Sequence, residues 1–325
     1  KKVDSSKTYE HKMKLMLLSA VLAYLDTIAA SLGNTFPTYK SCVESCTSDI
    51  CSSDGYYFAN PELTSLPLLL LWRCSDDCQY RCMWGVVDTF QKKGWPPPQF
   101  HGKWPFVRFL GIQEPASTFF SLLNFGLHAK SFSKFLRDIR HSNPMFKVWI
   151  AYALISMNGW IWSAVFHTRD TSFTELMDYL SAFGLVFSSA YGVGMRLLLF
   201  KRRIYSIAFT LLCLLFYVNH AIYLSSGLFD YKYNLVANII VGTFLVLNCI
   251  LFIVINRSLP QTKPLAIAVT TITGALYLEI IDFPPYFWVL DAHSLWHLLT
   301  APVTHYFWRY ILQDTKYLQK EISTW

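Results

Sequence analysis

The chain has 325 residues, of which 53% are hydrophobic, 17% are aromatic and only 15% are charged. Soluble proteins carry about a quarter of charged residues, so this composition excludes an ordinary soluble fold and indicates a membrane protein. The net charge of +7 does not indicate nucleic-acid binding, because the basic residues form short clusters between apolar runs, as they do around membrane spans.

The first part of the chain resembles a targeting signal. From Met13, the stretch MKLMLLSAVLAYL combines a basic residue with an apolar core of signal-peptide length. The small residues AAS at 29–31 suit cleavage near Ser31, whereas residues 1–12 are polar and fit no signal design. We therefore assign residues 1–31 to a polar extension and a signal peptide.

The next segment, residues 32–112, is polar and rich in cysteine. It contains six of the eight cysteines in the chain, namely Cys42, Cys46, Cys51, Cys74, Cys78 and Cys82. An even number of clustered cysteines behind a signal-like stretch indicates disulfides in an oxidising compartment. Zinc is the competing interpretation, although its usual ligand spacing is CxxC rather than the CxxxC found here.

The mirrored CxxxC spacing also predicts how these cysteines pair. Six cysteines allow many connectivities, but two antiparallel helices would bring them into register within the Cα separation that a disulfide needs. Disulfides of this kind replace core burial in a small domain. We therefore expect three nested bonds, Cys42–Cys82, Cys46–Cys78 and Cys51–Cys74.

After QEPAS at 113–117 the sequence becomes apolar, in windows long enough to span a bilayer. We expect seven spans, at about residues 116–136, 146–168, 173–198, 204–225, 233–255, 265–282 and 289–312. The first window is the weakest, because it contains His128 and Lys130. The predicted fold class is thus an all-α membrane protein, in which residues 113–325 form a seven-transmembrane helix bundle behind a small disulfide-rich domain.

Basic residues gather on one side of the predicted spans. They lie after the first, third and fifth windows, for example in KRR at 201–203, and after the seventh. By the positive-inside rule this side and the C-terminus are cytosolic, so the N-terminal domain lies in the lumen, where disulfides form. The glycosylation sequon at Asn256 then lies on the cytosolic side, and we expect no glycan on it.

Polar residues near the lumenal ends of three spans form the candidate site. They are Ser163 and His167 in WSAVFHT, Asp178 in MDY, and His293 and His297 in DAHSLWH. Members of each pair are four residues apart, so they share one face of a helix. Ionisable side chains at membrane depth are costly and mark functional sites.

Three neutral imidazoles with an open fourth position are typical of a catalytic zinc site. We therefore predict that His167, His293 and His297 bind Zn²⁺. Asp178 would take a proton from the attacking water, and Ser163 would hydrogen-bond the developing oxyanion.

Two chemical alternatives are weaker. A serine-hydrolase triad of Ser163, His167 and Asp178 lacks the G-x-S-x-G elbow, because the serine stands in WIWSAVF. His305, two turns beyond His297, is an alternative ligand that we interpret as a packing or hydrogen-bonding residue. We interpret His101 and His220 as structural residues too.

The strings QFHGKWPF, QEPAS, FHTRDT, MDY, FDYKYNLVAN and DFPPYFWVLDAHSLWH resemble the post-GPI-attachment-to-proteins factor three family. The resemblance runs from about Tyr39 to about Leu318. This family is part of the CREST superfamily of seven-span hydrolases, with the alkaline ceramidases and adiponectin receptors. The superfamily's serine, histidine, aspartate and terminal histidine pair match positions 163, 167, 178, 293 and 297.

The resemblance implies a GPI-specific phospholipase that removes the sn-2 acyl chain from the anchors of GPI-anchored proteins. Its partners would be the lipid and glycan of the anchor and the surrounding membrane lipid, in the endoplasmic reticulum or the Golgi. One alternative is a ceramidase-like amide hydrolase of the same superfamily. The other is a non-enzymatic heptahelical receptor or GPI-binding protein with a structural metal.

Overall fold

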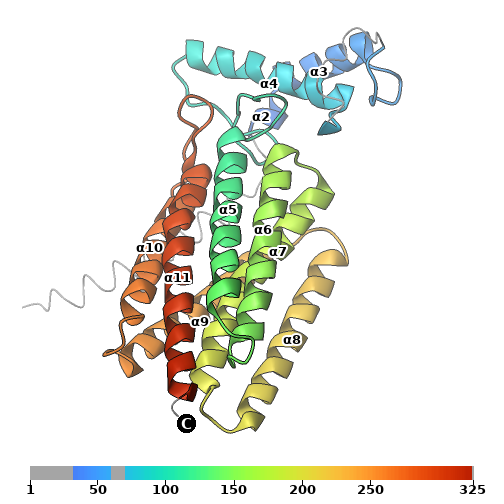
Figure 1. Cartoon of the computed structure of the whole chain (residues 1–325). Coiled ribbons are helices and arrows are strands. Elements are labelled where there is room, and N and C mark those ends of the chain that lie inside the picture. Colours follow the sequence, from blue (N-terminus) through green and yellow to red (C-terminus); the bar gives the residue numbers. More distant parts are fainter. Residues whose placement is uncertain (1–31, 60–69, 324–325) are drawn as a thin grey trace, which may run out of the picture. The chain divides into compact units, whose positions relative to one another are not determined.

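The computed structural model describes residues 32–59 and 70–323, and its regular elements there are helices (Figure 1). They are α2 (Leu32–Thr35), α3 (Pro37–Ile50), α4 (Cys74–Lys92), α5 (Pro115–Asp138), α6 (Phe146–Thr168), α7 (Ser172–Leu198), α8 (Arg203–Ser225), α9 (Tyr231–Ile255), α10 (Thr262–Ile280) and α11 (Ala292–Ser323). The all-α prediction is confirmed for this part of the chain. The signal peptide predicted from Met13 lies outside the described residues.

The chain divides into two compact units. The first, which we call the disulfide unit, comprises the described residues up to Ile112 together with Tyr277–Ala292. The second, which we call the helical unit, comprises Gln113–Leu276 and His293–Trp325. The segment between α10 and α11 therefore folds with residues of the N-terminal part of the chain, although it is distant from them in sequence.

The disulfide unit is built on α3 and α4, which pack against each other. Because two antiparallel helices align their cysteines in opposite order, the bonds are nested. They join Cys42 to Cys82, Cys46 to Cys78 and Cys51 to Cys74, with Cα separations of 5.8, 5.7 and 5.6 Å. All six cysteines are thus used in disulfides, and the alternative that they bind zinc is wrong for this structure.

The segment 277–292 is held in the disulfide unit by polar contacts. The carboxylate of Asp282 accepts hydrogen bonds from Gln99 Nε2, at 2.7 Å, and from Trp104 Nε1. The backbone N–H of Val107 donates to the carbonyl of Trp288 at 2.9 Å. Residues 282–292 of the string DFPPYFWVLDAH therefore belong to this unit, whereas His293 at its end belongs to the helical unit.

The helical unit contains α5 to α9, most of α10, and α11. Helix α6 packs against α5 and α7, and α7 also packs against α8 and α9; Figure 1 shows α5, α6 and α7 running side by side. A Cβ atom at Gly192 of α7 would lie 2.5 Å from the Trp149 ring of α6. A glycine at that position lets the two helices approach closely, as small residues do between membrane helices.

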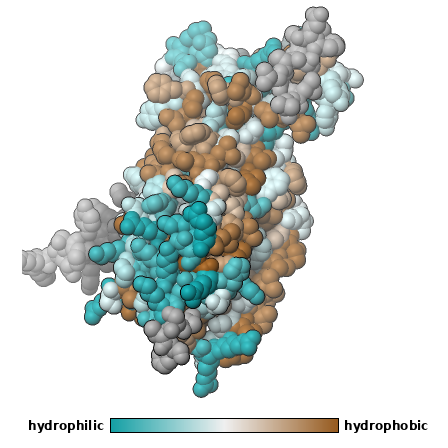
Figure 2. Space-filling view, in the orientation of Figure 1, coloured by the Kyte–Doolittle hydropathy of each residue, from teal (hydrophilic) through white to brown (hydrophobic). Residues whose placement is uncertain are grey.

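Four helices, α6, α7, α8 and α9, are long and apolar enough to cross a membrane. Their outward faces are apolar as well: Leu212, Leu215 and Val254 are 64–68% exposed, and Figure 2 shows brown, apolar side chains over much of the visible surface. So large an exposed apolar surface indicates contact with lipid. The chain is therefore a membrane protein.

Helices α5, α10 and α11 are not among these four, although seven spans were predicted. Two of the three carry polar residues that face inward. Asn124 and His128 of α5 and Thr304 of α11 are buried. Such residues lower the mean hydropathy of a helix without exposing a polar group to lipid.

Helix α11 continues well beyond the predicted end at residue 312. In this extension Asp314, which is fully buried, accepts hydrogen bonds from Arg196 Nε of α7 at 2.6 Å and from Nη2 at 3.0 Å. Gln261 Nε2 donates to the same carboxylate at 3.3 Å. Because breaking a buried ion pair leaves an uncompensated charge, this contact fixes α11 against α7.

Candidate metal centre

Three histidines converge in the helical unit. His167 lies in the last turn of α6, and His293 and His297 lie in the first two turns of α11. Their ring centroids are 4.6–5.2 Å apart, and one potential ligand atom from each ring lies within 4.8 Å of the other two. The structure thus brings together the three histidines that the sequence singled out.

Glu114, the residue before α5, is a polar partner of His167. Its Oε2 lies 2.7 Å from Nδ1 of His167, and both side chains are buried. Two backbone hydrogen bonds hold them together, from Glu114 N to His167 O at 2.9 Å and from Gln113 N to Thr168 O at 3.0 Å. An ionised carboxylate can only accept, so it pairs with Nδ1–H of His167; in the neutral ring the lone pair then lies on Nε2.

The ring nitrogens fit a metal cation. Nε2 of His167 is buried and has no hydrogen-bond partner among the described residues. The Nε2 atoms of His293 and His297 lie 3.0 Å apart. A carboxylate behind a histidine is also the usual arrangement at metal sites, where it fixes the orientation of the ring. The donor set of three imidazoles is one of those that catalytic zinc sites use.

A network of hydrogen bonds fixes the position of α11 along the axis of α5. Asn124 Nδ2 donates to the backbone carbonyl of His297 at 2.9 Å, and Asn124 Oδ1 accepts from Thr304 Oγ1 at 3.1 Å. One turn further along, Trp308 Nε1 donates to Nδ1 of the buried His128 at 2.9 Å. Each of these bonds would be lost if α11 slid along α5, so the network fixes the position of His297.

The two predicted catalytic residues differ in their surroundings. Ser163 is buried one turn before His167, and its Oγ lies 3.0 Å from Oγ of Ser121. Ser121 Oγ also lies 2.7 Å from the carbonyl of Ser117, and when its proton points there Ser163 is the donor to Ser121. Asp178 is half-buried in the second turn of α7 and is not a member of the converging group.

The other histidines of interest lie apart from the group. His305 is exposed, makes a ring contact with Tyr306 and is not in the three-histidine group, so it is not a packing residue of the core. His220 is buried against Phe183, with ring centroids 3.7 Å apart. His101 hydrogen-bonds within the disulfide unit. Neither of the latter two belongs to the three-histidine group, and their contacts agree with a structural role.

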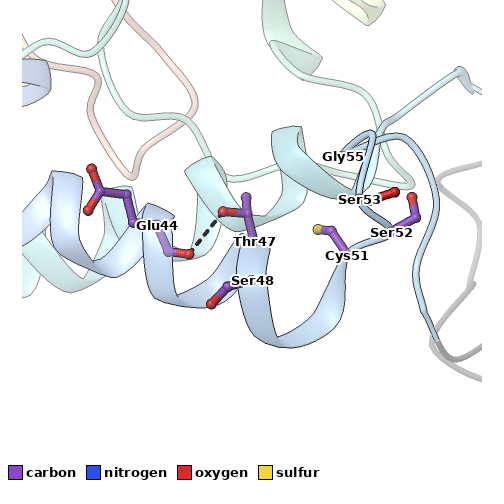
Figure 3. Close-up of a pocket in the computed structure, with 7 residues that line it drawn as sticks. All are labelled: Glu44, Thr47, Ser48, Cys51, Ser52, Ser53 and Gly55. Carbon is purple, nitrogen blue, oxygen red and sulfur yellow. Dashed lines mark hydrogen bonds between the residues drawn. The ribbon is translucent and has the colours of Figure 1, made fainter.

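A surface hollow in the disulfide unit is the pocket drawn in Figure 3. It is lined by Glu44, Thr47, Ser48, Cys51, Ser52, Ser53 and Gly55. Thr47 Oγ1 donates to the Glu44 carbonyl at 3.0 Å, and Cys51 is in a disulfide. Its lining therefore contains no free thiol and no histidine, unlike the group of three histidines.

Comparisons with known proteins agree with the resemblance seen in the sequence. Residues 65–315 match the Per1-like family. The chain is 39% identical over 309 residues to the human GPI-specific phospholipase A2-like PGAP3, across 95% of this chain and 96% of the relative. It is 41% identical over 292 residues to the mouse protein of that name (90% and 91%). It is 39% identical over 300 residues to the Drosophila melanogaster post-GPI attachment to proteins factor 3 (88% and 91%).

Proposed function

The chain belongs to the Per1-like family, and we propose that it is a zinc-dependent hydrolase that removes the sn-2 acyl chain from the GPI anchors of proteins. The observation that carries this proposal is the group of His167, His293 and His297 with Glu114 behind it. Structural zinc sites fill all four positions with protein ligands. A group of three histidines among the described residues therefore supports a catalytic site with one position open. The names of the relatives supply the substrate class.

For the topology we propose seven spans, α5 to α11, which make residues 113–325 the hydrolase domain. His167 ends α6 and His293 opens α11, so antiparallel helices would carry both histidines to one face of the membrane. The disulfides support the lumen as that side. Residues 32–112 would then form a lumenal domain, with the C-terminus in the cytosol and the protein in the endoplasmic reticulum or the Golgi.

The proposed depth suits the bond that is cleaved. The sn-2 ester of a glycerolipid lies just below the headgroup, at the level of the lumenal ends of the spans. When bound, zinc would supply a Lewis acid that polarises the ester and lowers the pKa of water. The hydrogen bond to Glu114 fixes the orientation of the His167 ring. The hydrogen bonds of Asn124 fix the position of His297 along the axis of α11.

Two residues of the chain are assigned to the chemical step. Asp178 accepts the proton that the attacking water loses and returns it to the leaving glycerol oxygen. Ser163 hydrogen-bonds the ester oxygen once its hydroxyl turns away from Ser121. We propose water, not serine, as the nucleophile; in support, the described partner of the Ser163 hydroxyl is the hydroxyl of Ser121 and not a base.

A purified GPI-anchored protein with an isotopic label in the sn-2 acyl chain tests the proposal. We expect the purified enzyme, reconstituted in lipid nanodiscs, to release the labelled fatty acid and leave a lyso-anchor, as measured by mass spectrometry. A chelator should abolish release and added Zn²⁺ should restore it. If the enzyme cleaved a ceramide amide but not the anchor, the proposal would be wrong and the enzyme would be an amidase. Anchor binding without release of fatty acid would replace it by a non-enzymatic role.

A further inference from the structure

Two tryptophans extend the histidine group into a cluster of five rings. The Trp160 ring of α6 lies against His297, with centroids 5.5 Å apart. The Trp296 ring of α11 lies against both His297, at 5.2 Å, and His293, at 5.9 Å. Since His167 contacts both of these imidazoles, the five rings are continuous.

Both indole nitrogens of this cluster are buried, and neither has an acceptor among the described residues. An indole N–H can only donate a hydrogen bond. A buried donor without an acceptor is costly and calls for a bound molecule or an ordered water. The cluster thus combines a free lone pair on His167, which suits a cation, with N–H donors that suit an oxygen.

Trp160 is the better placed donor of the two. It is nine-tenths buried, whereas Trp296 is half-buried. It lies three residues before Ser163 and seven before His167, so all three residues share one face of α6. When the proton of Ser163 points to Ser121, that bond must break before Ser163 can donate elsewhere. The N–H of Trp160 breaks no bond when it donates.

We infer that Trp160 donates its indole N–H to the carbonyl oxygen of the scissile ester, and strengthens that bond as the oxygen becomes negative. This inference rests on the proposed function. In the step, water adds to the carbonyl carbon and the bond from that carbon to the glycerol oxygen breaks. Asp178 carries the proton from the water to the leaving oxygen. Trp160 supplies a hydrogen bond and loses no proton, so it acts as an oxyanion donor.

The variant Trp160→Phe keeps an aromatic ring beside His297 and removes the donor. We expect kcat for acyl release to fall about 10²-fold with KM little changed, as when one oxyanion donor is removed. Zinc content should stay at the wild-type level. Trp162→Phe is the matched control, because Trp162 stands on the same helix with its ring against Phe173 at 5.6 Å. It should leave kcat, KM and zinc content unchanged.

Binding of two uncleavable lipids gives a readout that does not depend on turnover. One carries a tetrahedral phosphonate in place of the sn-2 ester, and the other an sn-2 ether, which has no carbonyl oxygen. Trp160→Phe should weaken phosphonate binding about 10²-fold and leave ether binding unchanged. If wild-type protein releases no acyl chain, the proposed function fails, and the difference in affinity between the two lipids still tests the donor.

Replacement of Trp160 by 3-benzothienylalanine separates the N–H from the shape of the ring. This residue matches tryptophan in size and lacks the donor, so we expect the same loss of kcat as in Trp160→Phe. Full activity of this variant would show that only ring packing counts, and would overturn the inference. Unchanged phosphonate affinity in Trp160→Phe would also overturn it, as the N–H would then bind water alone. Loss of zinc in either variant would reduce Trp160 to a support for His297.

Discussion

Glu114 and His167 are joined at two levels, through their side chains at 2.7 Å and through the backbone from Glu114 N to His167 O at 2.9 Å. The start of α5 is thereby tied to the end of α6. The carboxylate fixes the proton of His167 on Nδ1 and leaves Nε2 for a metal. We place this pair at the base of the proposed zinc site.

Glu114→Gln should therefore weaken metal binding without unfolding the protein. The amide keeps the size of the side chain but has no negative charge. In the wild type that charge favours the proton on Nδ1 and makes the His167 ring more basic. Replacement of a carboxylate in this position typically lowers metal affinity by about 10–100-fold. Competition with a chromophoric chelator measures the effect. Glu321→Gln, at the exposed end of α11, is the matched control and should bind zinc like the wild type.

Asp178→Asn should separate catalysis from metal binding. The amide retains the shape of the side chain but cannot accept a proton, so acyl release should fall by about 10²–10⁴-fold. Zinc content should remain full, because Asp178 is not a member of the converging group. Asp138→Asn, which removes a surface ion pair with the exposed Lys316, should leave both properties unchanged. Loss of zinc in Asp178→Asn would show that the aspartate is a ligand.

Ser163→Ala should give a partial loss of about 10²-fold in kcat, as expected for a donor to the oxyanion. In Ser121→Ala the loss of kcat should be smaller, because this substitution removes the hydroxyl that is hydrogen-bonded to Ser163. Kinetics of both variants on one labelled anchor provide the comparison. A completely inactive Ser163→Ala, together with an acyl-serine trapped on the wild-type enzyme, would establish serine as the nucleophile instead.

Much of the helical unit could be predicted because each apolar window carries its own signal. The windows at 146–168 and 204–225 coincide within one residue with α6 (Phe146–Thr168) and α8 (Arg203–Ser225). The histidine pair on α11 was visible for the same reason, since a spacing of four residues within one helix is local information. The nested disulfides followed from the mirrored cysteine spacing.

The features that the sequence did not predict depend on partners that are distant in the chain. Glu114 precedes an apolar window and looks like its polar boundary, and only the fold brings it to His167, 53 residues later. The extension of α11 depends on Asp314, whose partner Arg196 lies 118 residues earlier. The direction of the Ser163 proton depends on Ser121 of a neighbouring helix. None of these relationships has a local signal.

Glycosylation mapping checks the proposed topology. Asn256 should carry no glycan, because it follows α9 on the side proposed as cytosolic; its side chain also donates to the Phe252 carbonyl at 2.9 Å. The double substitution Leu228→Asn and Asp230→Thr creates a sequon between α8 and α9, where Leu228 is fully exposed. That asparagine should be glycosylated in cells. A glycan on Asn256 in the wild-type protein would reverse the orientation.

The zinc content of purified His297→Ala tests the metal centre most directly. His305→Ala is the matched control, because His305 lies two turns further along α11 and is exposed. Inductively coupled plasma mass spectrometry should find about one zinc per chain in the wild type and in His305→Ala. It should find little or none in His297→Ala, because three protein ligands are the usual minimum for such a site. Acyl release should be lost in the variant that lacks zinc and retained in the variant that binds it. Full zinc occupancy in His297→Ala would contradict the metal centre described here.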